Sequence, residues 1–319
     1  MTWNVYRTIA VHGCKGGVGK STVSAGIALS LVDQGFSVGL CDLDICGPNI
    51  ACILGADESH VIWRQVKLDE YAIKYDAHAV TPTEDAYQAN GACRNESSAC
   101  CGDVFCDIAL DRPDTATTSL LEPKEVHGIK LMSFAFIKSR SDLGYAAYRG
   151  PMLDQISSEL VLKTDWGRLD YLVLDLPPGT GDVIISLMEE ITVSGLVAVS
   201  TPHQLSLKDT VKSVRLFQDH QVPIVCIVEN MSYFTCDGCN KLHNLFGPSQ
   251  SARMAESLGV KDSVCLPMMV YGDDIVEYLK SNQEIRRKLG DITRLIIENP
   301  ATSPAGASPI KRYVAFTQP

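Results

Sequence analysis

Short apolar runs alternate with longer amphipathic segments along most of this 319-residue chain. The apolar runs are rich in Val, Ile and Leu, which is typical of buried strands, and the segments between them repeat apolar residues with helical spacing. The expected strands are residues 6–11, 37–41, 129–133, 171–175, 196–200, 224–228 and 263–266. The expected helices are residues 20–34, 145–163, 183–190, 206–218, 249–257 and 274–298. This alternation predicts an α/β fold in which helices flank a mostly parallel sheet.

Two segments depart from this alternation. The residues from about 67 to 122 are polar and rich in turn residues, and the segment is longer than connections in compact domains usually are. We interpret it as an irregular insertion that contains cysteines. The tail over residues 299–319 has too few apolar residues to order itself. The sequence therefore predicts one domain over residues 1–298, followed by a flexible C-terminal tail.

A glycine-rich sequence, Cys-Lys-Gly-Gly-Val-Gly-Lys-Ser-Thr, lies between the first expected strand and the first expected helix. Glycines let the backbone turn its N–H groups around a polyphosphate, and the helix start adds unpaired N–H groups. The lysine before the serine reaches the β- and γ-phosphates, and the serine hydroxyl is a usual Mg²⁺ ligand. The alternative is a glycine-rich strand-to-helix turn without a ligand. The expected nucleotide-binding residues are Gly16, Gly17, Val18, Gly19, Lys20, Ser21 and Thr22, with Ser21 also on Mg²⁺.

Two other strands are followed by or end in carboxylates. Asp42 and Asp44 follow the second expected strand, and Asp175 ends the fourth, shortly before Gly179. Ligands bind at the carboxyl ends of the strands in such a sheet. We expect Asp42 and Asp175 to serve the Mg²⁺ water shell, and Asp44 to orient the attacking water. Gly179 can donate its N–H to the γ-phosphate. A solvated turn or a helix cap is the alternative for Asp42 and Asp44.

The loop resembles those of the MinD, ParA and Mrp group of P-loop ATPases, because Lys15 precedes its glycines. In that group the corresponding lysine crosses a face-to-face dimer to the nucleotide of the partner. The resemblance therefore implies ATP as the ligand, a dimer, and a catalytic role for Lys15 beside Lys20 and Asp44. One departure is Cys14, which stands where the common loop begins with Gly.

Further motifs narrow this resemblance. Residues 44–49, 148–152, 175–182 and 229–232 occur in the order seen in Mrp-type ATPases. They look like the cytosolic iron-sulfur cluster assembly nucleotide-binding proteins, and the likeness covers roughly residues 5–295 apart from the insertion. It implies that Asn230 lies near the adenine.

Cys236 and Cys239 are separated by an Asp-Gly turn, which directs both thiols the same way. Such a pair can hold one metal centre. A [4Fe-4S] cluster normally takes four protein thiolates, so one chain supplies half of them and a face-to-face dimer would supply all. Zinc is a second interpretation, with His243 as a candidate ligand but no evident fourth. A thioredoxin-like dithiol fits less well, because it normally follows an early strand.

The remaining cysteines fall into two groups. Cys41, Cys226 and Cys265 lie in apolar runs, and we expect them to be small buried side chains. The insertion contains four more, whose spacing matches no common iron-sulfur pattern, and we expect these not to be ligands. They are Cys93, Cys100, Cys101 and Cys106.

The long branch of this family has an N-terminal segment with four cysteines, which is absent before the loop here. The chain therefore resembles the short branch, that of nucleotide-binding protein 2. This implies a homodimer or a heterocomplex with a long-branch member. The expected function is a dimeric scaffold that slowly hydrolyses MgATP and carries [4Fe-4S] clusters to cytosolic and nuclear apoproteins.

Composition and charge exclude several other partners. Acidic residues outnumber basic ones by 38 to 28, which argues against nonspecific binding of nucleic acid. The chain has no apolar run of about twenty residues, so we expect no membrane span. The first strand begins almost at Met1, which leaves no room for a targeting peptide, and we expect a cytoplasmic protein. The alternative function, a spatial-positioning ATPase like MinD or ParA, gives no reason for Cys236 and Cys239.

Overall fold

The computed structural model describes residues 4–56, 59–67, 117–137, 150–270, 272 and 274–299. The strands are β1 (Asn4–His12), β2 (Val38–Asp42), β3 (Trp63–Lys67), β4 (Thr117–Leu121), β5 (Lys124–Val126), β6 (Ile129–Ser133), β7 (Arg168–Asp175), β8 (Gly195–Ser200), β9 (Ile224–Thr235), β10 (Leu242–His243) and β11 (Ser263–Pro267). The helices are α1 (Lys20–Asp33), α2 (Ile50–Ile53), α4 (Gly150–Leu162), α5 (Asp182–Glu190), α6 (Gln204–Asp219), α7 (Ser251–Ser257), α8 (Ile275–Ser281) and α9 (Gln283–Glu298), with the 3-10 helix η2 (Phe134–Phe136).

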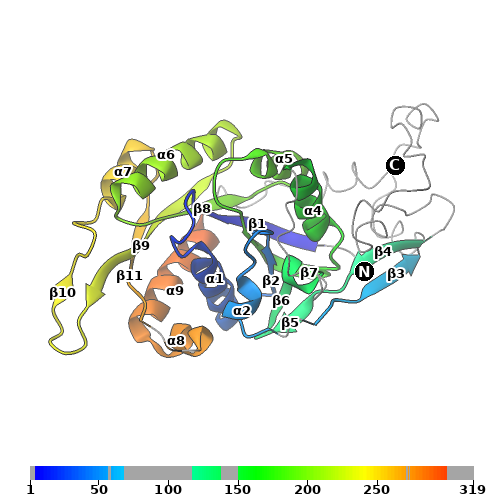
Figure 1. Ribbon diagram of the computed structural model, residues 1–319, viewed down its shortest axis with the longest axis horizontal. Helices are drawn as coiled ribbons and strands as arrows, with labels where there is room; N and C mark the ends of the chain where they lie inside the picture. Colours follow the sequence, from blue (N-terminus) through cyan, green and yellow to red (C-terminus); the bar gives the residue numbers. More distant parts are fainter. Residues whose placement is uncertain are drawn as a thin grey trace, which may run out of the picture.

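One large sheet organises the described part of the chain (Figure 1). Its strand order is β10-β9-β8-β1-β7-β2-β6-β5, and β11 also pairs with β9. The central pairs are parallel, whereas β5 with β6 and β10 with β9 are antiparallel. Strands β3 and β4 form a separate antiparallel pair. This confirms the predicted α/β fold with a mostly parallel sheet.

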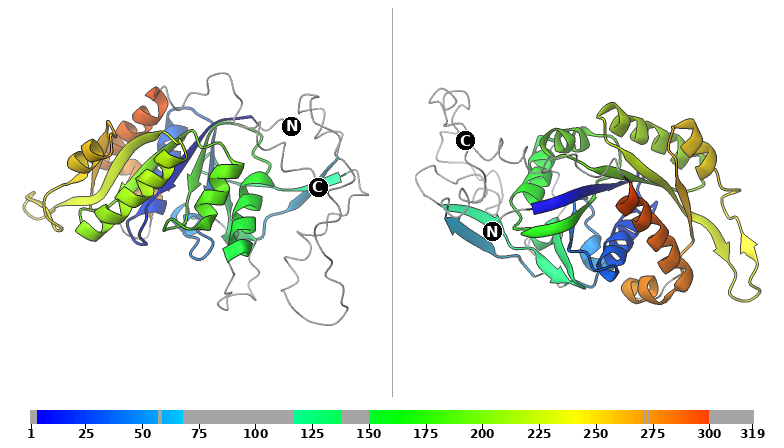
Figure 2. Two further views of the ribbon diagram at one scale, coloured as in Figure 1. Left: turned by 90° about the horizontal axis from the view of Figure 1, so that it is seen from above. Right: turned by 180° about the vertical axis from the view of Figure 1, so that it is seen from behind.

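Helices cover both faces of this sheet (Figure 2). Helix α1 packs against α9 on one face, and α4 packs against α5 on the other. The central strands β2 and β8 are buried at every position, as expected for parallel strands that are covered on both faces. No helix among the described residues is long and apolar enough to span a membrane.

The register of the central strands brings the predicted site residues to one edge. Val11 of β1 pairs with Asp175 of β7, and Asp175 pairs on its other side with Asp42 of β2. Both carboxylates therefore lie level with the end of β1, from which the glycine-rich loop leaves. This is the edge of the sheet where ligands bind in open α/β folds.

The last predicted helix, residues 274–298, is wrong as a single element. The structure contains two helices, α8 and α9, joined at Asn282. The Asn282 side chain accepts a hydrogen bond from the backbone N–H of Ile285, and its backbone is extended. Asn is among the best helix N-caps, because its side chain satisfies a free N–H at the start of a helix. It therefore begins a new helix here.

Two expected elements differ in length or form from those in the structure, and some expected features lie outside the described residues. Strand β9 continues seven residues beyond 228, to Thr235, because β11 and β10 go on pairing with it. Lys67, where the expected insertion begins, pairs with Thr117 in the β3–β4 sheet, so residues 117–121 near the end of the insertion form a strand and are not irregular. Residues 68–116 and 300–319 lie outside the described residues, as do the four cysteines of the insertion and positions 148 and 149 of the Tyr-Arg-Gly-Pro-Met motif.

Candidate functional site

The glycine-rich loop has the backbone conformation that a phosphate cradle requires. Gly17 and Gly19 have φ angles of 79° and 83°, which side chains other than Gly rarely adopt. Gly19 is also the N-cap of α1, and no side chain caps this helix start. Its first N–H groups are therefore available for an anion, and the helix dipole favours one there. Ser21 and Thr22 lie half-buried in the first turn.

Lys20 is held inside the site by a carboxylate. Its side chain is 7% exposed, and its Nζ lies 3.0 Å from Asp175 Oδ1. The Ser24 hydroxyl donates to the same oxygen at 2.8 Å. The other oxygen, Asp175 Oδ2, is buried and has no hydrogen-bond partner among the described residues. A buried carboxylate oxygen without a donor suits a hydrated Mg²⁺ ion, which binds carboxylates and phosphates together.

Asp42 is fully buried and already accepts three hydrogen bonds. Its oxygens accept from the backbone N–H groups of Asp44 and Ile50 and from the Ser133 hydroxyl. Burial, and next the charge of Asp175 on the neighbouring strand, raise the pKa of Asp42 to about 7. Asp42 therefore holds the chain segment that follows β2, and its direct part in an Mg²⁺ shell stays a prediction.

Asp44 lies closer to solvent at the same edge. Its Oδ2 is 3.9 Å from Lys20 Nζ, and its side chain is 19% exposed. Burial raises the pKa of this carboxyl, and the Lys20 ammonium opposes that rise. A partly exposed carboxylate next to the phosphate-binding lysine can reach both water and phosphate. Gly179, on the loop after β7, has a φ of 97°.

His12 is a site residue that the sequence analysis missed. It ends β1 directly before the loop, and its ring is buried against Phe217, with 5.6 Å between ring centroids. Burial, and next the charge of Lys20, lower its pKa to about 3, although backbone groups of Gly179 and Pro177 oppose this. A neutral imidazole therefore lies between the phosphate loop and the loop after β7. The position of His12 directly before the glycine-rich loop is the sequence signal that could have identified it.

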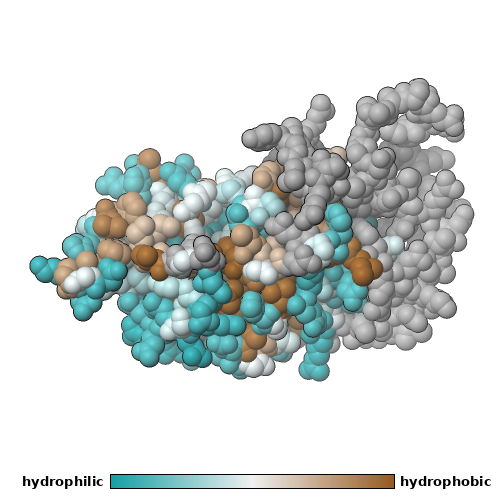
Figure 3. Space-filling view, turned by 60° about the horizontal axis from the view of Figure 1, so that its bottom comes forward, coloured by the Kyte–Doolittle hydropathy of each residue, from teal (hydrophilic) through white to brown (hydrophobic). Residues whose placement is uncertain are grey.

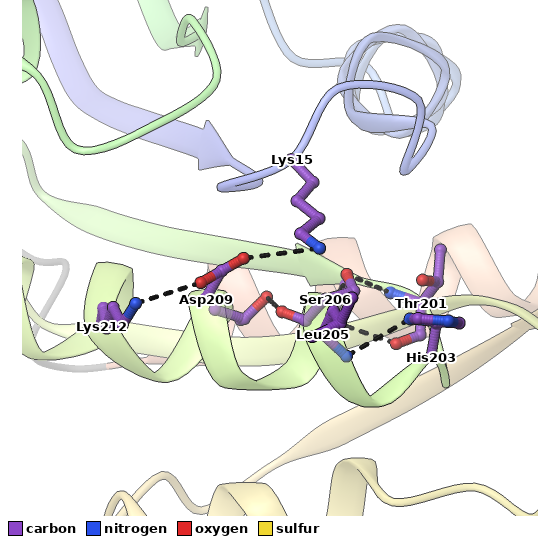
Figure 4. Close-up of polar contacts among 9 residues, drawn as sticks. Lys15, Thr201, His203, Leu205, Ser206, Asp209 and Lys212 are labelled. Carbon is purple, nitrogen blue, oxygen red and sulfur yellow. Dashed lines mark hydrogen bonds and ion pairs between the residues drawn. The ribbon is translucent and has the colours of Figure 1, made fainter.

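Lys15 points away from the phosphate loop of its own chain (Figure 4). Its Nζ lies 3.6 Å from Asp209 Oδ2 on α6, and Asp209 also contacts Lys212. Of the two loop lysines, Lys20 thus contacts the site carboxylates and Lys15 contacts α6. Cys14 beside it is half-buried, and burial followed by the charge of Asp209 raises the pKa of its thiol.

Asn230 packs against the back of the loop. Its Nδ2 donates to the Val18 carbonyl at 2.9 Å, and its Oδ1 is buried without a hydrogen-bond partner among the described residues. A Cβ placed on Gly19 would lie 2.1 Å from Asn230 Nδ2, so a side chain there would displace the amide. The structure therefore joins Asn230 to the nucleotide loop, and its contact with adenine stays a prediction.

Cys236 and Cys239 lie at the tip of the hairpin formed by β9 and β10, which projects from the sheet (Figure 1). Hydrogen bonds from the backbone N–H groups of Cys239 and Gly238, and then from the Cys239 thiol, lower the pKa of Cys236. The Cys236 sulfur thus receives its hydrogen bonds from within the same turn, and it favours the thiolate that metals bind. Exposed apolar side chains follow on the same hairpin and loop: Leu242, Leu245 and Phe246. The hairpin forms the left end of Figure 3, where polar and apolar residues are mixed.

The structure does not complete this pair within the described residues. No three His, Cys, Asp or Glu side chains there converge to hold a metal ion. His243 is exposed on β10 and does not extend the pair into such a group. Cys41 and Cys226 are buried as expected, and burial raises the pKa of both thiols. Cys265 is only half-buried.

Comparison with known proteins gives the family. The family model described as NUBPL iron-transfer P-loop NTPase, of the ParA class, matches residues 4–81 and 105–293. The chain belongs to this family. The iron-sulfur cluster transfer protein NUBPL of Dictyostelium discoideum is 34% identical over 252 residues, which are 79% of this chain and 62% of that protein. The iron-sulfur cluster carrier protein of Aquifex aeolicus is 32% identical over 264 residues, 83% of this chain and 58% of that protein.

A solved structure shows the same fold. The nucleotide-binding protein of Archaeoglobus fulgidus in complex with ADP is 27% identical and has a TM-score of 0.58, covering 93% of this chain and 90% of that one. The resemblance to Mrp-type nucleotide-binding proteins is thus confirmed at the level of the family. The chain spans only about 60% of the length of the two curated relatives named above.

Proposed function

We propose that this chain is an ATP-binding and hydrolysing carrier that assembles [4Fe-4S] clusters between two subunits and transfers them to apoproteins. The observation that carries the proposal is the thiol pair of half-buried Cys236 and exposed Cys239, directly after the strand β9 that contacts the phosphate loop. Membership of the iron-transfer P-loop family supports it. Among the described residues no three candidate ligands converge, which supports the dimer, because four thiolates are normal for such a cluster.

The chemistry of nucleotide binding follows from the site. The loop N–H groups around Gly17 and Gly19 bind the phosphates, and Lys20 neutralises their charge. Asp175 Oδ2 and the Ser21 hydroxyl would hold the Mg²⁺ that accompanies ATP and withdraws charge from the phosphates. Asp44 accepts a hydrogen bond from the attacking water and orients it. Thr22 adds a hydroxyl beside Ser21 in the same turn.

Lys15 completes the proposed site from the other subunit. In one chain its ammonium lies at Asp209 on α6, and Lys20 supplies the cation at the chain's own carboxylates. A lysine at the surface of the loop can reach the phosphates of a second subunit that faces it. Lys15→Ala is therefore expected to retain ATP binding and to lose hydrolysis.

The cluster assignment is tested by anaerobic reconstitution of the wild type and a Cys236→Ala/Cys239→Ala variant. For the wild type we expect about two iron atoms and two sulfides per chain and a dimeric mass. For the variant we expect neither bound iron and sulfide nor a dimeric mass. The matched control is Cys46→Ala/Cys52→Ala, which removes two other exposed thiols. Full iron and sulfide content in the Cys236→Ala/Cys239→Ala variant would refute the assignment, and stoichiometric zinc in the wild type would replace it.

The proposal includes finer points of partner and place. The second subunit is another copy of this chain or a longer family member, as the likeness to the short branch implies. Mixing the two chains before reconstitution distinguishes these cases by mass. We place the protein in the cytoplasm, with recipients there and in the nucleus, and cell fractionation tests this placement.

A further inference from the structure

Strand β9 physically joins the two parts of the proposed site. Asn230 in its middle contacts the phosphate loop, and the strand ends directly before Cys236. The residue that contacts the phosphate loop and the first thiol are thus on one continuous segment of backbone. A movement of this segment at Asn230 therefore either ends within the strand or reaches Cys236.

The contact at the loop is close enough to be sensitive. The amide of Asn230 occupies the space beside Gly19 that a side chain would otherwise fill. Gly19 is the residue from which α1 starts, and its positive φ belongs to the cradle itself. A change in the loop that accompanies phosphate binding must therefore displace the Asn230 amide or alter its hydrogen bond to Val18.

Met231, the next residue, is a strained joint. Its φ is 55°, in the left-handed region, which is unusual for a long side chain. It lies where the register between β9 and β11 shifts, so the strand is irregular at this point. The residues on either side are fixed. Asn230 bonds to the loop, and the Ser232 hydroxyl donates to Glu229 Oε1 at 2.6 Å. Glu229 is fully buried, and its Oε2 accepts from the backbone N–H of Gln250 at the start of α7.

Beyond this joint the strand leads directly to the thiols. The Tyr233 carbonyl accepts from the Met268 N–H at 2.6 Å, which is a contact close to the sheet. The hairpin tip is closed by its own hydrogen bonds, Cys236 N–H to Lys241 carbonyl and Asn240 N–H to Cys236 carbonyl. The Tyr233 hydroxyl also donates to Glu284 Oε1 on α9 at 2.6 Å. A rotation at Met231 therefore reaches the hairpin through Tyr233, whose contacts with Met268 and Glu284 must shift with it.

We infer that Asn230 and Met231 are positioning residues that couple the nucleotide at the phosphate loop to the presentation of Cys236 and Cys239 within one chain. This inference rests on the proposed function, in which the loop binds ATP and the thiols hold the cluster. It differs from coupling through the dimer interface, because it operates in a single subunit. Coupling of this kind requires two arrangements of the joint, which the nucleotide favours unequally.

The test measures the alkylation rates of Cys236 and Cys239 by mass spectrometry, without nucleotide, with MgADP and with a nonhydrolysable MgATP analogue. We expect the wild-type rates to change at least threefold with nucleotide, and by the same factor at all protein concentrations. Met231→Gly, which accepts a positive φ without strain, is expected to reduce the change to less than half. Gln221→Gly is the matched control, because Gln221 has a φ of 60° but lies before β9, and it should keep the full change.

Separate measurements distinguish the failures. Absence of nucleotide binding in the wild type overturns the proposed function and this inference with it. Nucleotide binding with unchanged thiol rates overturns only the inference, and so does a full response in Met231→Gly. A response that grows with protein concentration assigns the coupling to the dimer interface instead. At saturating nucleotide, Asn230→Ala should show the same reduced change in alkylation rates as Met231→Gly. A full change in alkylation rates in Asn230→Ala also contradicts the coupling.

Discussion

Replacing Asp42 by Asn is expected to change how the stability of the protein depends on pH. Asp42 is fully buried beside Asp175, and the pKa of its carboxyl rises from 3.8 to about 7. The folded state therefore holds a proton on Asp42 between about pH 4 and 7, where the unfolded chain has released it. The folded state binds more protons in this range, so this group costs stability as the pH rises through it.

The magnitude follows from the size of the shift. Each pH unit in this range costs about 1.4 kcal/mol, and the full shift amounts to about 4 kcal/mol, reached near pH 7 and constant above it. Asn carries no charge, so Asp42→Asn removes this cost. However, the NH₂ group of Asn is a donor, and it would face one of the backbone N–H groups that now donate to Asp42. The lost hydrogen bond costs about 1–3 kcal/mol of stability at every pH. The stability of the variant relative to wild type should thus rise by about 2–3 kcal/mol from pH 5 to pH 8.

Urea unfolding of both proteins without nucleotide, at half-unit steps from pH 5 to pH 8, measures this difference. Comparing variant with wild type cancels the contribution of His12, whose lowered pKa makes stability fall as the pH drops below about 6.5. Asp170→Asn is the control. A hydroxyl and an N–H of Ser37 lower the pKa of that exposed carboxyl, so its contribution is constant above pH 5. A difference between Asp42→Asn and wild type that is constant from pH 5 to 8 would refute the argument.

Three further predictions follow from contacts of the described residues. Lys20→Ala should weaken ATP binding about 100-fold and lower the free energy of unfolding by about 3 kcal/mol, because Asp175 loses a buried partner. Calorimetry measures the affinity and urea unfolding the stability, with exposed Lys208→Ala as the control. An unchanged ATP affinity would contradict the assignment of Lys20 to the nucleotide site. Asp209→Asn frees Lys15 and should raise ATP hydrolysis by the dimer about two- to fivefold at unchanged ATP affinity; no increase means that the Lys15 contact does not restrain the lysine. Asn282→Ala removes the cap of α9 and should cost about 1 kcal/mol in urea unfolding, whereas Gln283→Ala should cost little; equal losses in the two variants would count against the cap.

The fold and the outline of the site could be predicted because each rests on local signals. A buried parallel strand is a short apolar run, and β1, β2, β6, β7, β8 and β11 all lie where such runs occur. The phosphate loop is a contiguous motif, and two of its glycines, Gly17 and Gly19, have the positive φ angles that favour Gly. The thiol pair is likewise contiguous, and the groups that lower the pKa of Cys236 belong to the same short turn.

Other features depend on contacts that sequence spacing does not reveal. The break at Asn282 was missed because the apolar repeat continues across it, although a cap residue was there to be noticed. The extension of β9 depends on pairing with β10 and β11, which are distant partners. The place of Lys15 at Asp209, and of Asn230 behind Gly19, depends on how α6 and β9 pack beside the loop.

The arrangement of charges at the strand ends favours a cation in the nucleotide complex. One buried ammonium, that of Lys20, faces Asp175 and Asp44, and Asp42 lies beside them on the next strand. Burial, and next the charge of Asp175, raise the pKa of Asp42 to about 7, so a second full negative charge here is costly when only Lys20 opposes it. A divalent ion at Asp175 Oδ2 would lower that cost, and it would balance the phosphates that Lys20 alone cannot neutralise. The same carboxylates should therefore bind MgATP more tightly than ATP without a metal, with the preference reduced in Asp175→Asn.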